Sequence, residues 1–226
     1  MEKFRLLLEG LQNGAIKPLI FLICGKFISP NTESSRCEVV LRDSLLEFEN
    51  MLSKFPEITS RSTFLFVPSS EDLVSSDTFP RSQIPESVTA RIRSRYPLVN
   101  FTSNPSRIEY CTQEIVIIRQ DTSKYLKRNS IFPFVGSFSS NVVKTLSAQA
   151  SLLPGSNAKT PVHPSFLRAI SLYPIPDCVV IAEDMDPYIE NHNDSVFINP
   201  GSFSKNGFCF ILYRFSSRSA EISRIE

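Results

Sequence analysis

The chain has 226 residues, with 24 Lys and Arg against 23 Asp and Glu, a formal net charge of +1 and only two histidines. This near-neutral balance argues against a stand-alone nucleic-acid binder, which normally carries a basic excess. Two histidines leave little material for a histidine-rich metal site, and five scattered cysteines without a CxxC pair argue against zinc and favour a reducing, intracellular location. The length predicts one globular domain, and no apolar run reaches the roughly 18–20 residues of a membrane span.

The first third of the chain predicts a β-loop-α-β unit. Residues 3–11 place apolar side chains at helical spacing, and the continuous apolar run 19–24 predicts a strand buried on both faces. Residues 41–55 predict an amphipathic helix closed by Pro56, and 63–67 predict a second buried strand. Two such strands joined through a helix form a parallel pair with a right-handed crossover.

The middle of the chain is expected to alternate loops, helices and strands. Asp121 can cap a short helix that runs through Lys127. The other expected elements are, in order, a loop over 69–85, a helix over 85–96, strands over 99–102 and 114–119, a helix over 141–150 and a proline-bearing loop over 154–164.

The last third is rich in strands. Apolar runs predict strands over 178–182, 195–199 and 207–213, and the last two are expected to pair as an antiparallel hairpin across the link 200–206. The chain is therefore expected to have an α/β fold.

Short loops follow four of the predicted strands, at the carboxyl ends where binding sites gather in open α/β folds. By composition alone each is an ordinary turn-forming loop. Taken in order, however, they resemble the loops of the calcineurin-like metallophosphoesterases. Their sequences are Cys24-Gly25-Lys26-Phe27-Ile28-Ser29, Val67-Pro68-Ser69-Ser70-Glu71-Asp72, Ile181-Ala182-Glu183-Asp184-Met185-Asp186-Pro187 and Ile198-Asn199-Pro200-Gly201-Ser202.

This resemblance implies a calcineurin-like phosphoesterase β-sandwich flanked by helices, with a degenerate metal site. The family places Gly-Asp-x-x-Asp, Gly-Asn-His-Asp/Glu and Gly-His-x-His motifs after successive strands. Here the ligand positions of those motifs hold Lys26, Ser29, Ser70, Glu71, Glu183 and Met185, whereas Asp72 and Asn199-Pro200-Gly201-Ser202 match the family. We therefore expect no catalytic residue, no metal and no cofactor.

The chemistry of the substituted residues supports this expectation. A two-metal hydrolase needs deprotonated oxygen and imidazole ligands around its ions, and a charged Lys26 has no lone pair to offer. Ser70 and Met185 are poor replacements for Asn and His. We expect His163 and His192 at the surface. The acidic side chains near the strand ends are expected to form a solvated cluster rather than a cation site; they are Glu71, Asp72, Glu183, Asp184 and Asp186.

A more specific likeness runs in order over roughly residues 19–213. The sequence resembles the B subunits of the eukaryotic replicative DNA polymerases, and among them the second-largest subunits of DNA polymerase epsilon. The stretches that carry it include Thr102-Ser103-Asn104-Pro105-Ser106-Arg107-Ile108-Glu109-Tyr110-Cys111-Thr112-Gln113-Glu114-Ile115, Tyr173-Pro174-Ile175-Pro176-Asp177 and Asp186-Pro187-Tyr188.

The resemblance implies a non-catalytic scaffold in the nucleus that binds the C-terminal region of the catalytic subunit of DNA polymerase epsilon and other replisome components. Direct DNA contact is expected to be weak or absent, and no membrane is involved. Residues 1–226 would then be an inactive phosphoesterase domain without its first strand and without the upstream oligonucleotide-binding-type and N-terminal helical domains of the family.

Two alternatives and two sets of contact residues remain open at this point. The alternatives are an atypical active metallophosphoesterase and a B subunit of polymerase alpha or delta. Phe132, Phe134, Phe138 and the 154–164 loop are candidates for partner contacts or for ordinary packing. The arginines of the 85–96 helix can meet DNA or an acidic partner, or form a solvated helix face; they are Arg91, Arg93 and Arg95.

Overall fold

A computed structural model describes residues 1–14, 16–29, 31–73, 78–155 and 160–225. The chain divides into two compact units, one comprising residues 1–76 and 81–104 and the other comprising residues 77–80 and 105–224. Parts of the two loops predicted over 69–85 and 154–164 lie outside the described residues. In the part of the chain that the structure describes, no helix is both long and apolar enough to cross a bilayer.

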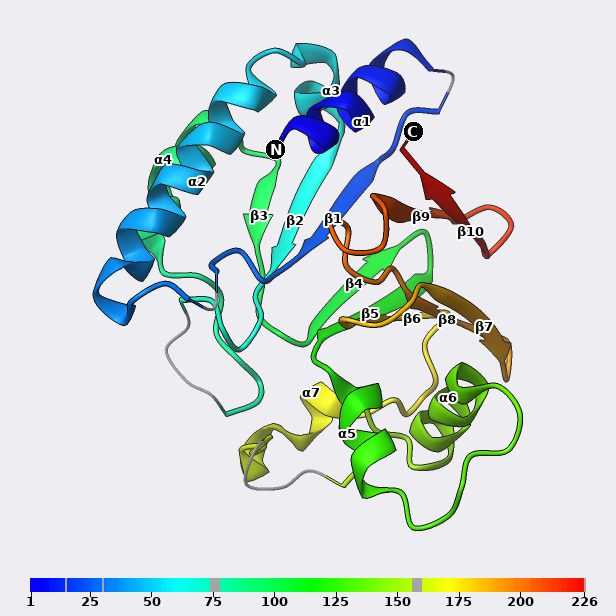
Figure 1. Ribbon diagram of the computed structural model, residues 1–226. Coiled ribbons are helices and arrows are strands. Elements are labelled where there is room, and N and C mark those ends of the chain that lie inside the picture. The colour runs from blue at the N-terminus through cyan, green and yellow to red at the C-terminus, as the bar shows by residue number, and fades with distance from the viewer. Residues whose placement is uncertain (15, 30, 74–77, 156–159, 226) are drawn as a thin grey trace. The chain divides into compact units, whose positions relative to one another are not determined.

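The first unit is built around a three-stranded parallel sheet, drawn in blue to green in Figure 1. Its strands lie in the order β1-β2-β3, with Ile20 opposite Thr63 and Phe64 opposite Val99. This confirms the predicted parallel pair. The elements are α1 (Glu2–Asn13), β1 (Ile20–Cys24), a 3₁₀ turn (Ser34–Arg36), α2 (Cys37–Leu52), α3 (Pro56–Arg61), β2 (Thr63–Val67), α4 (Glu86–Arg95) and β3 (Val99–Phe101).

Aromatic side chains form the centre of this unit's core. The ring of Phe48 on α2 meets Phe66 on β2 edge-on at 5.3 Å, and Phe66 stacks on Phe101 of β3 at 4.9 Å. Such edge-on and offset ring contacts stabilise a core beyond the apolar area that they bury. Helix α2 was predicted from its apolar face, and this is the face that packs on the sheet.

Two expectations for this unit are wrong in detail. Strand β1 is half-buried, with Phe21 as its one buried residue, because it forms one edge of the sheet instead of lying inside it. Helix α2 ends at Leu52 rather than at the proline, and Pro56 instead begins α3. Proline suits the first turn of a helix because the backbone donor that it lacks has no partner there in any case.

The second unit contains a five-stranded mixed sheet and a separate hairpin, shown from green to red in Figure 1. The sheet order is β4-β5-β6-β8-β7, in which β5, β6 and β8 are parallel to one another. Its elements are β4 (Ser106–Tyr110), β5 (Gln113–Arg119), α5 (Thr122–Asn129), α6 (Phe138–Ala148), a 3₁₀ turn (Pro164–Phe166), α7 (Leu167–Ile170), β6 (Cys178–Ala182), β7 (Tyr188–His192), β8 (Ser195–Asn199), β9 (Cys209–Arg214) and β10 (Ser219–Arg224).

The predicted pairing of the last two strands is wrong. Strand β8 lies between β6 and β7 inside the five-stranded sheet, whereas β9 pairs with β10. All five residues of β8 are buried, and a central position between two strands covers them better than an isolated hairpin would. Three strands absent from the prediction, β4, β7 and β10, complete the second unit.

Candidate functional site

The loop after β1 and the loop after β2 are joined by the buried carboxylate of Asp72. Its Oδ1 accepts hydrogen bonds from the backbone N–H groups of Phe27 at 2.6 Å and Ile28 at 3.1 Å. Its Oδ2 accepts from the backbone N–H and the hydroxyl of Ser69, both at 2.8 Å. Both oxygens are thus engaged by donors within the first unit, and Asp72 holds the two loops together.

Gly25 is shaped by the same carboxylate. A Cβ added to Gly25 would lie 2.0 Å from Oδ2 of Asp72 and 3.0 Å from the backbone nitrogen of Ser69. The backbone N–H of Gly25 donates to the carbonyl of Val67 at 2.8 Å, which extends the pairing of the two strands by one residue. Only glycine fits here without displacing the Asp72 carboxylate.

The substituted positions of these two loops pair with each other or face solvent. Nζ of Lys26 lies 2.5 Å from Oε1 of Glu71, and the two side chains are 30% and 38% exposed. Ser29 and Ser70 are exposed. The first unit therefore brings Lys26 and Glu71 together as an ion pair, at the places where the resemblance puts an aspartate and a histidine.

In the second unit, Glu183 follows β6 and is 3% exposed. Its carboxylate accepts from the backbone N–H of Ser123 at 2.8 Å, from the hydroxyl of Ser123, and from the hydroxyl of Tyr188 at 3.4 Å. Burial raises the pKa of Glu183 to about 7, against the lowering effect of the bonds from Ser123. The pKa of Tyr188 is also raised, first by burial and then by the neighbouring Glu183.

Glu183 thereby caps α5. The expectation that Asp121 caps this helix is wrong: it occupies the N-cap position without a side-chain cap bond. Its carboxylate instead accepts from Arg119 at 3.1 Å and from the backbone N–H of Asp184 at 3.2 Å. The sequence carries only a weak signal for Ser123 as the partner of Glu183, because a serine in the first turn of a helix is common.

The loops after β6 and β8 are linked to each other in the same way as the loops of the first unit. Oδ1 of the buried Asn199 accepts from the N–H of Glu183 at 3.3 Å and of Gly201 at 2.9 Å, while its Nδ2 donates to the carbonyl of Asp186 at 3.2 Å. Asp184 forms an ion pair with Lys205. Met185 is half-buried.

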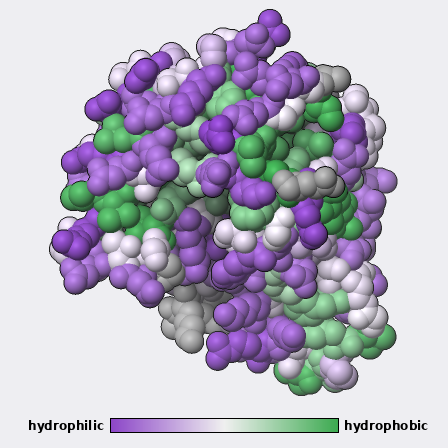
Figure 2. Space-filling model, turned by 45° about the horizontal axis from the view of Figure 1, so that its top comes forward, coloured by the Kyte–Doolittle hydropathy of each residue, from purple (hydrophilic) through white to green (hydrophobic). Residues whose placement is uncertain are grey.

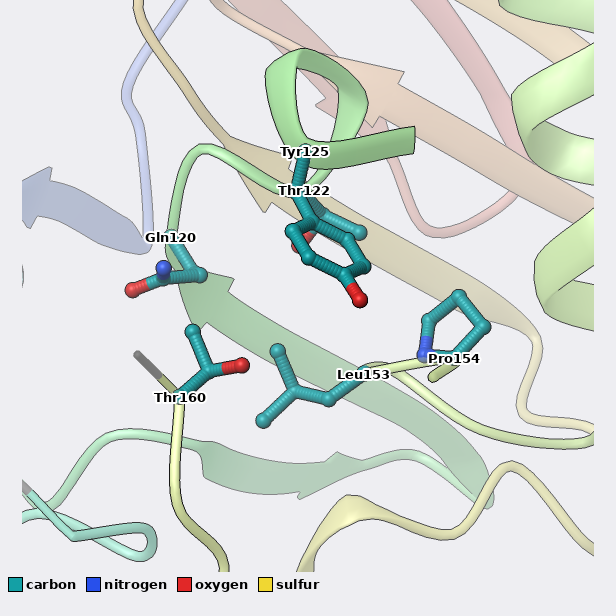
Figure 3. A pocket seen from close by; sticks show the side chains of 6 residues that line it. All are labelled: Gln120, Thr122, Tyr125, Leu153, Pro154 and Thr160. Carbon is teal, nitrogen blue, oxygen red and sulfur yellow. The ribbon is translucent and has the colours of Figure 1, made fainter. Parts of the chain in front are cut away.

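A narrow hollow lies beside the N-terminus of α5 (Figure 3). The space left inside it is about 10 Å³, which is room for a single water molecule. The hydroxyl of Tyr125 donates to the carbonyl of Gly155 at 2.6 Å on one side of it. The hollow is too small for a substrate; its lining residues are Gln120, Thr122, Tyr125, Leu153, Pro154 and Thr160.

The charged groups at the strand ends have partners within their own units. Lys26 offers an ammonium, Asp72 and Glu183 already accept several hydrogen bonds each, and Asp184 pairs with a lysine. Within the described ranges, no group of three or more His, Cys, Asp or Glu side chains is placed to hold a metal ion. His163 is exposed and His192 is half-buried at the end of β7.

Residues 1–190 match the family described as the B subunit of DNA polymerase alpha/epsilon. The chain belongs to this family. DNA polymerase epsilon subunit 2 of Mus musculus is 36% identical to it over 228 residues, which are 100% of this chain and 43% of the relative. The B subunit of DNA polymerase epsilon from Arabidopsis thaliana is 30% identical, over 100% of this chain and 44% of the relative. The chain thus spans less than half the length of these curated relatives.

Solved structures show the fold of this member of the B-subunit family. An archaeal phosphodiesterase superposes with a TM-score of 0.51 at 11% identity, covering 99% of this chain and 92% of that protein. A protein of Pyrococcus horikoshii OT3 gives a TM-score of 0.51 at 14% identity, covering 100% and 82%. The predicted calcineurin-like phosphoesterase fold is confirmed, and at these identities the likeness concerns the fold alone.

Proposed function

We propose that this chain is part of a non-catalytic accessory subunit of the DNA polymerase epsilon complex. Membership of the B-subunit family and the names of the relatives support this assignment. The structural observation that supports it most is the use of the strand-end carboxylates: Asp72 and Glu183 bind neighbouring loops and a helix end instead of facing an open site.

In this proposal the positions at which the fold family carries metal ligands are degenerate. They are Lys26, Ser29, Ser70, Glu71, Glu183 and Met185. In the complex the protein binds the C-terminal region of the catalytic subunit, contacts other replisome components, works in the nucleus and touches DNA weakly or indirectly. Residues 1–226 correspond to the inactive phosphoesterase domain of the longer subunit.

Two measurements test the proposal. Co-expression of the full chain with candidate catalytic subunits of polymerases epsilon, alpha and delta should yield a complex with the epsilon subunit, and failure to form one would contradict the assignment. In parallel, the purified chain is assayed on bis-p-nitrophenyl phosphate with manganese. We expect no turnover above that of an Asp72→Ala variant.

The competing function is an atypical metallophosphoesterase around Glu71, Asp72, Glu183 and Asp184. It requires these carboxylates to leave their present partners, and Lys26 places a positive charge beside Glu71. Manganese-dependent turnover that disappears in both Asp72→Ala and Asp184→Ala would favour this function over a purely structural one.

A further inference from the structure

The connection between α5 and α6 presents a concentrated group of exposed apolar side chains. Ile131 is 91% exposed, Phe132 80% and Val135 83%. Among the described residues, three of the four most exposed large apolar side chains therefore lie within five consecutive positions. Figure 2 shows hydrophobic side chains gathered at the lower edge of the face it draws, where Figure 1 places this connection. Concentrated exposed apolar groups mark contact surfaces.

The connection is held in place by its own contacts. Phe134 turns inward, with its ring edge-on to Phe138 at 4.8 Å, and Phe138 packs on the core of the second unit. Nδ2 of Asn141 donates to the carbonyl of Val135 at 2.7 Å and to that of Ser137 at 2.6 Å. The outward side chains are thus displayed from a tethered backbone, which lowers the entropy lost when they are covered.

The stretch of chain that holds this group carries positive charge only. No acidic residue occurs from 122 to 176, a stretch that contains six lysines and arginines. Three of these cations, Lys124, Lys127 and Arg128, are exposed on α5 immediately before the connection. Nζ of Lys127 lies 5.8 Å from the centre of the ring of Phe138, the residue on which Phe134 of the connection packs. The whole chain, by contrast, has a net charge of only +1.

We propose that Ile131, Phe132 and Val135, with the cations of α5, form a docking surface for an acidic segment of a partner protein that carries apolar side chains. Aliphatic Ile131 and Val135 favour a protein over a nucleic acid, since bases are bound by stacking on aromatic rings. The negative charge that we assign to the partner segment follows from complementarity with the positive charge of α5. This inference rests on the proposed function, in which the partner is another subunit of the polymerase epsilon complex.

The test uses the full chain co-expressed with the candidate catalytic subunit of DNA polymerase epsilon from the same organism, with affinity measured on the purified partners. Val135→Asp places an acid in the proposed surface, and Val39→Asp makes the same change at a 54% exposed position of α2. We expect Val135→Asp to weaken binding at least tenfold and Val39→Asp to leave it unchanged. The double variant Lys127→Glu/Arg128→Glu should weaken binding at low salt and flatten its salt dependence.

The outcomes separate this inference from the proposed function. Full binding by Val135→Asp overturns the docking surface while leaving the subunit assignment intact. If the unaltered chain binds no catalytic subunit, the assignment fails and the inference fails with it. A third outcome also overturns the inference: the variants bind a fluorescent 30-nucleotide single strand more weakly but keep their affinity for the catalytic subunit. The occupant of the surface is then a nucleic acid. Unchanged thermal unfolding confirms that each variant is folded.

Discussion

The ammonium of Lys26 lies 2.5 Å from the carboxylate of Glu71, across the loops that follow β1 and β2. Both side chains are about one-third exposed, so solvent screens their attraction. We expect Lys26→Ala to lower the free energy of unfolding by less than about 1 kcal/mol. A double-mutant cycle with Glu71→Ala, measured by urea unfolding, checks this, and a coupling well above that figure would show that the pair has a larger structural role.

Asp72 is expected to matter far more to stability than this ion pair. Asp72→Ala leaves two backbone N–H groups of the first loop and two donors of Ser69 without their acceptor. Unfolding free energy should fall by about 3 kcal/mol or more, because buried donors that lose a charged acceptor are costly. Asp43→Ala on the exposed face of α2 is the control, and it should change stability by less than about 0.5 kcal/mol.

Gly25 and Asp72 should be energetically coupled. Gly25→Ala forces the carboxylate away from a position 2.0 Å from the new Cβ, and we expect a loss of about 2 to 4 kcal/mol. The double variant Gly25→Ala/Asp72→Ala should lose much less stability than the sum of the two single losses, because the contact with the carboxylate is gone and only the 3.0 Å approach to the backbone nitrogen of Ser69 remains. Gly10→Ala in α1 meets nothing within 4 Å and should raise stability by about 0.5–1 kcal/mol. Additive losses at Gly25 and Asp72 would contradict the contact.

Glu183 should make stability depend on pH. Because the folded chain raises its pKa from 4.5 to about 7, unfolding releases a proton between these values. Its contribution to stability is therefore present below pH about 4.5 and is lost as pH rises to about 7, by about 3 kcal/mol in full. Glu183→Gln keeps the side chain neutral at every pH. The stability of this variant, relative to that of the unaltered chain, should therefore improve from pH 5 to pH 8. Glu190→Gln, at a half-buried position of β7, makes the same change of side chain and serves as the control.

Much of the fold follows from the apolar pattern, because β1, β2, β5, β6 and β8 are short apolar runs and α2 has a clear apolar face. The edge strands β4 and β7 of the second unit were harder to predict. Strand β4 alternates buried and exposed positions, and its turn to β5 uses Cys111 and Thr112 at positive φ, where the pattern leads one to expect glycine or asparagine. The turn from β7 to β8 at Asn193-Asp194 did carry that signal.

The candidate site was predictable in position but not in its contacts. The strand-end rule identified the loops that hold Asp72 and Glu183. The partner of Glu183 is Ser123, 60 residues earlier in the chain, and the partner of Asp184 is Lys205, on the loop after another strand. Such pairs depend on which strands lie side by side. A local pattern cannot reveal that arrangement, just as it could not place β8 between β6 and β7.

The four hydrogen bonds of Asp72 have an evolutionary consequence. The loss of stability expected when Asp72 is replaced is enough by itself to disfavour substitution, so natural selection can retain the acid even in a lineage that performs no hydrolysis. The same contact constrains Gly25, since a Cβ at this position would lie 2.0 Å from the acid. A persistent Gly and Asp at these loop positions across relatives would therefore record a requirement of folding and would be a poor indicator of enzymatic activity.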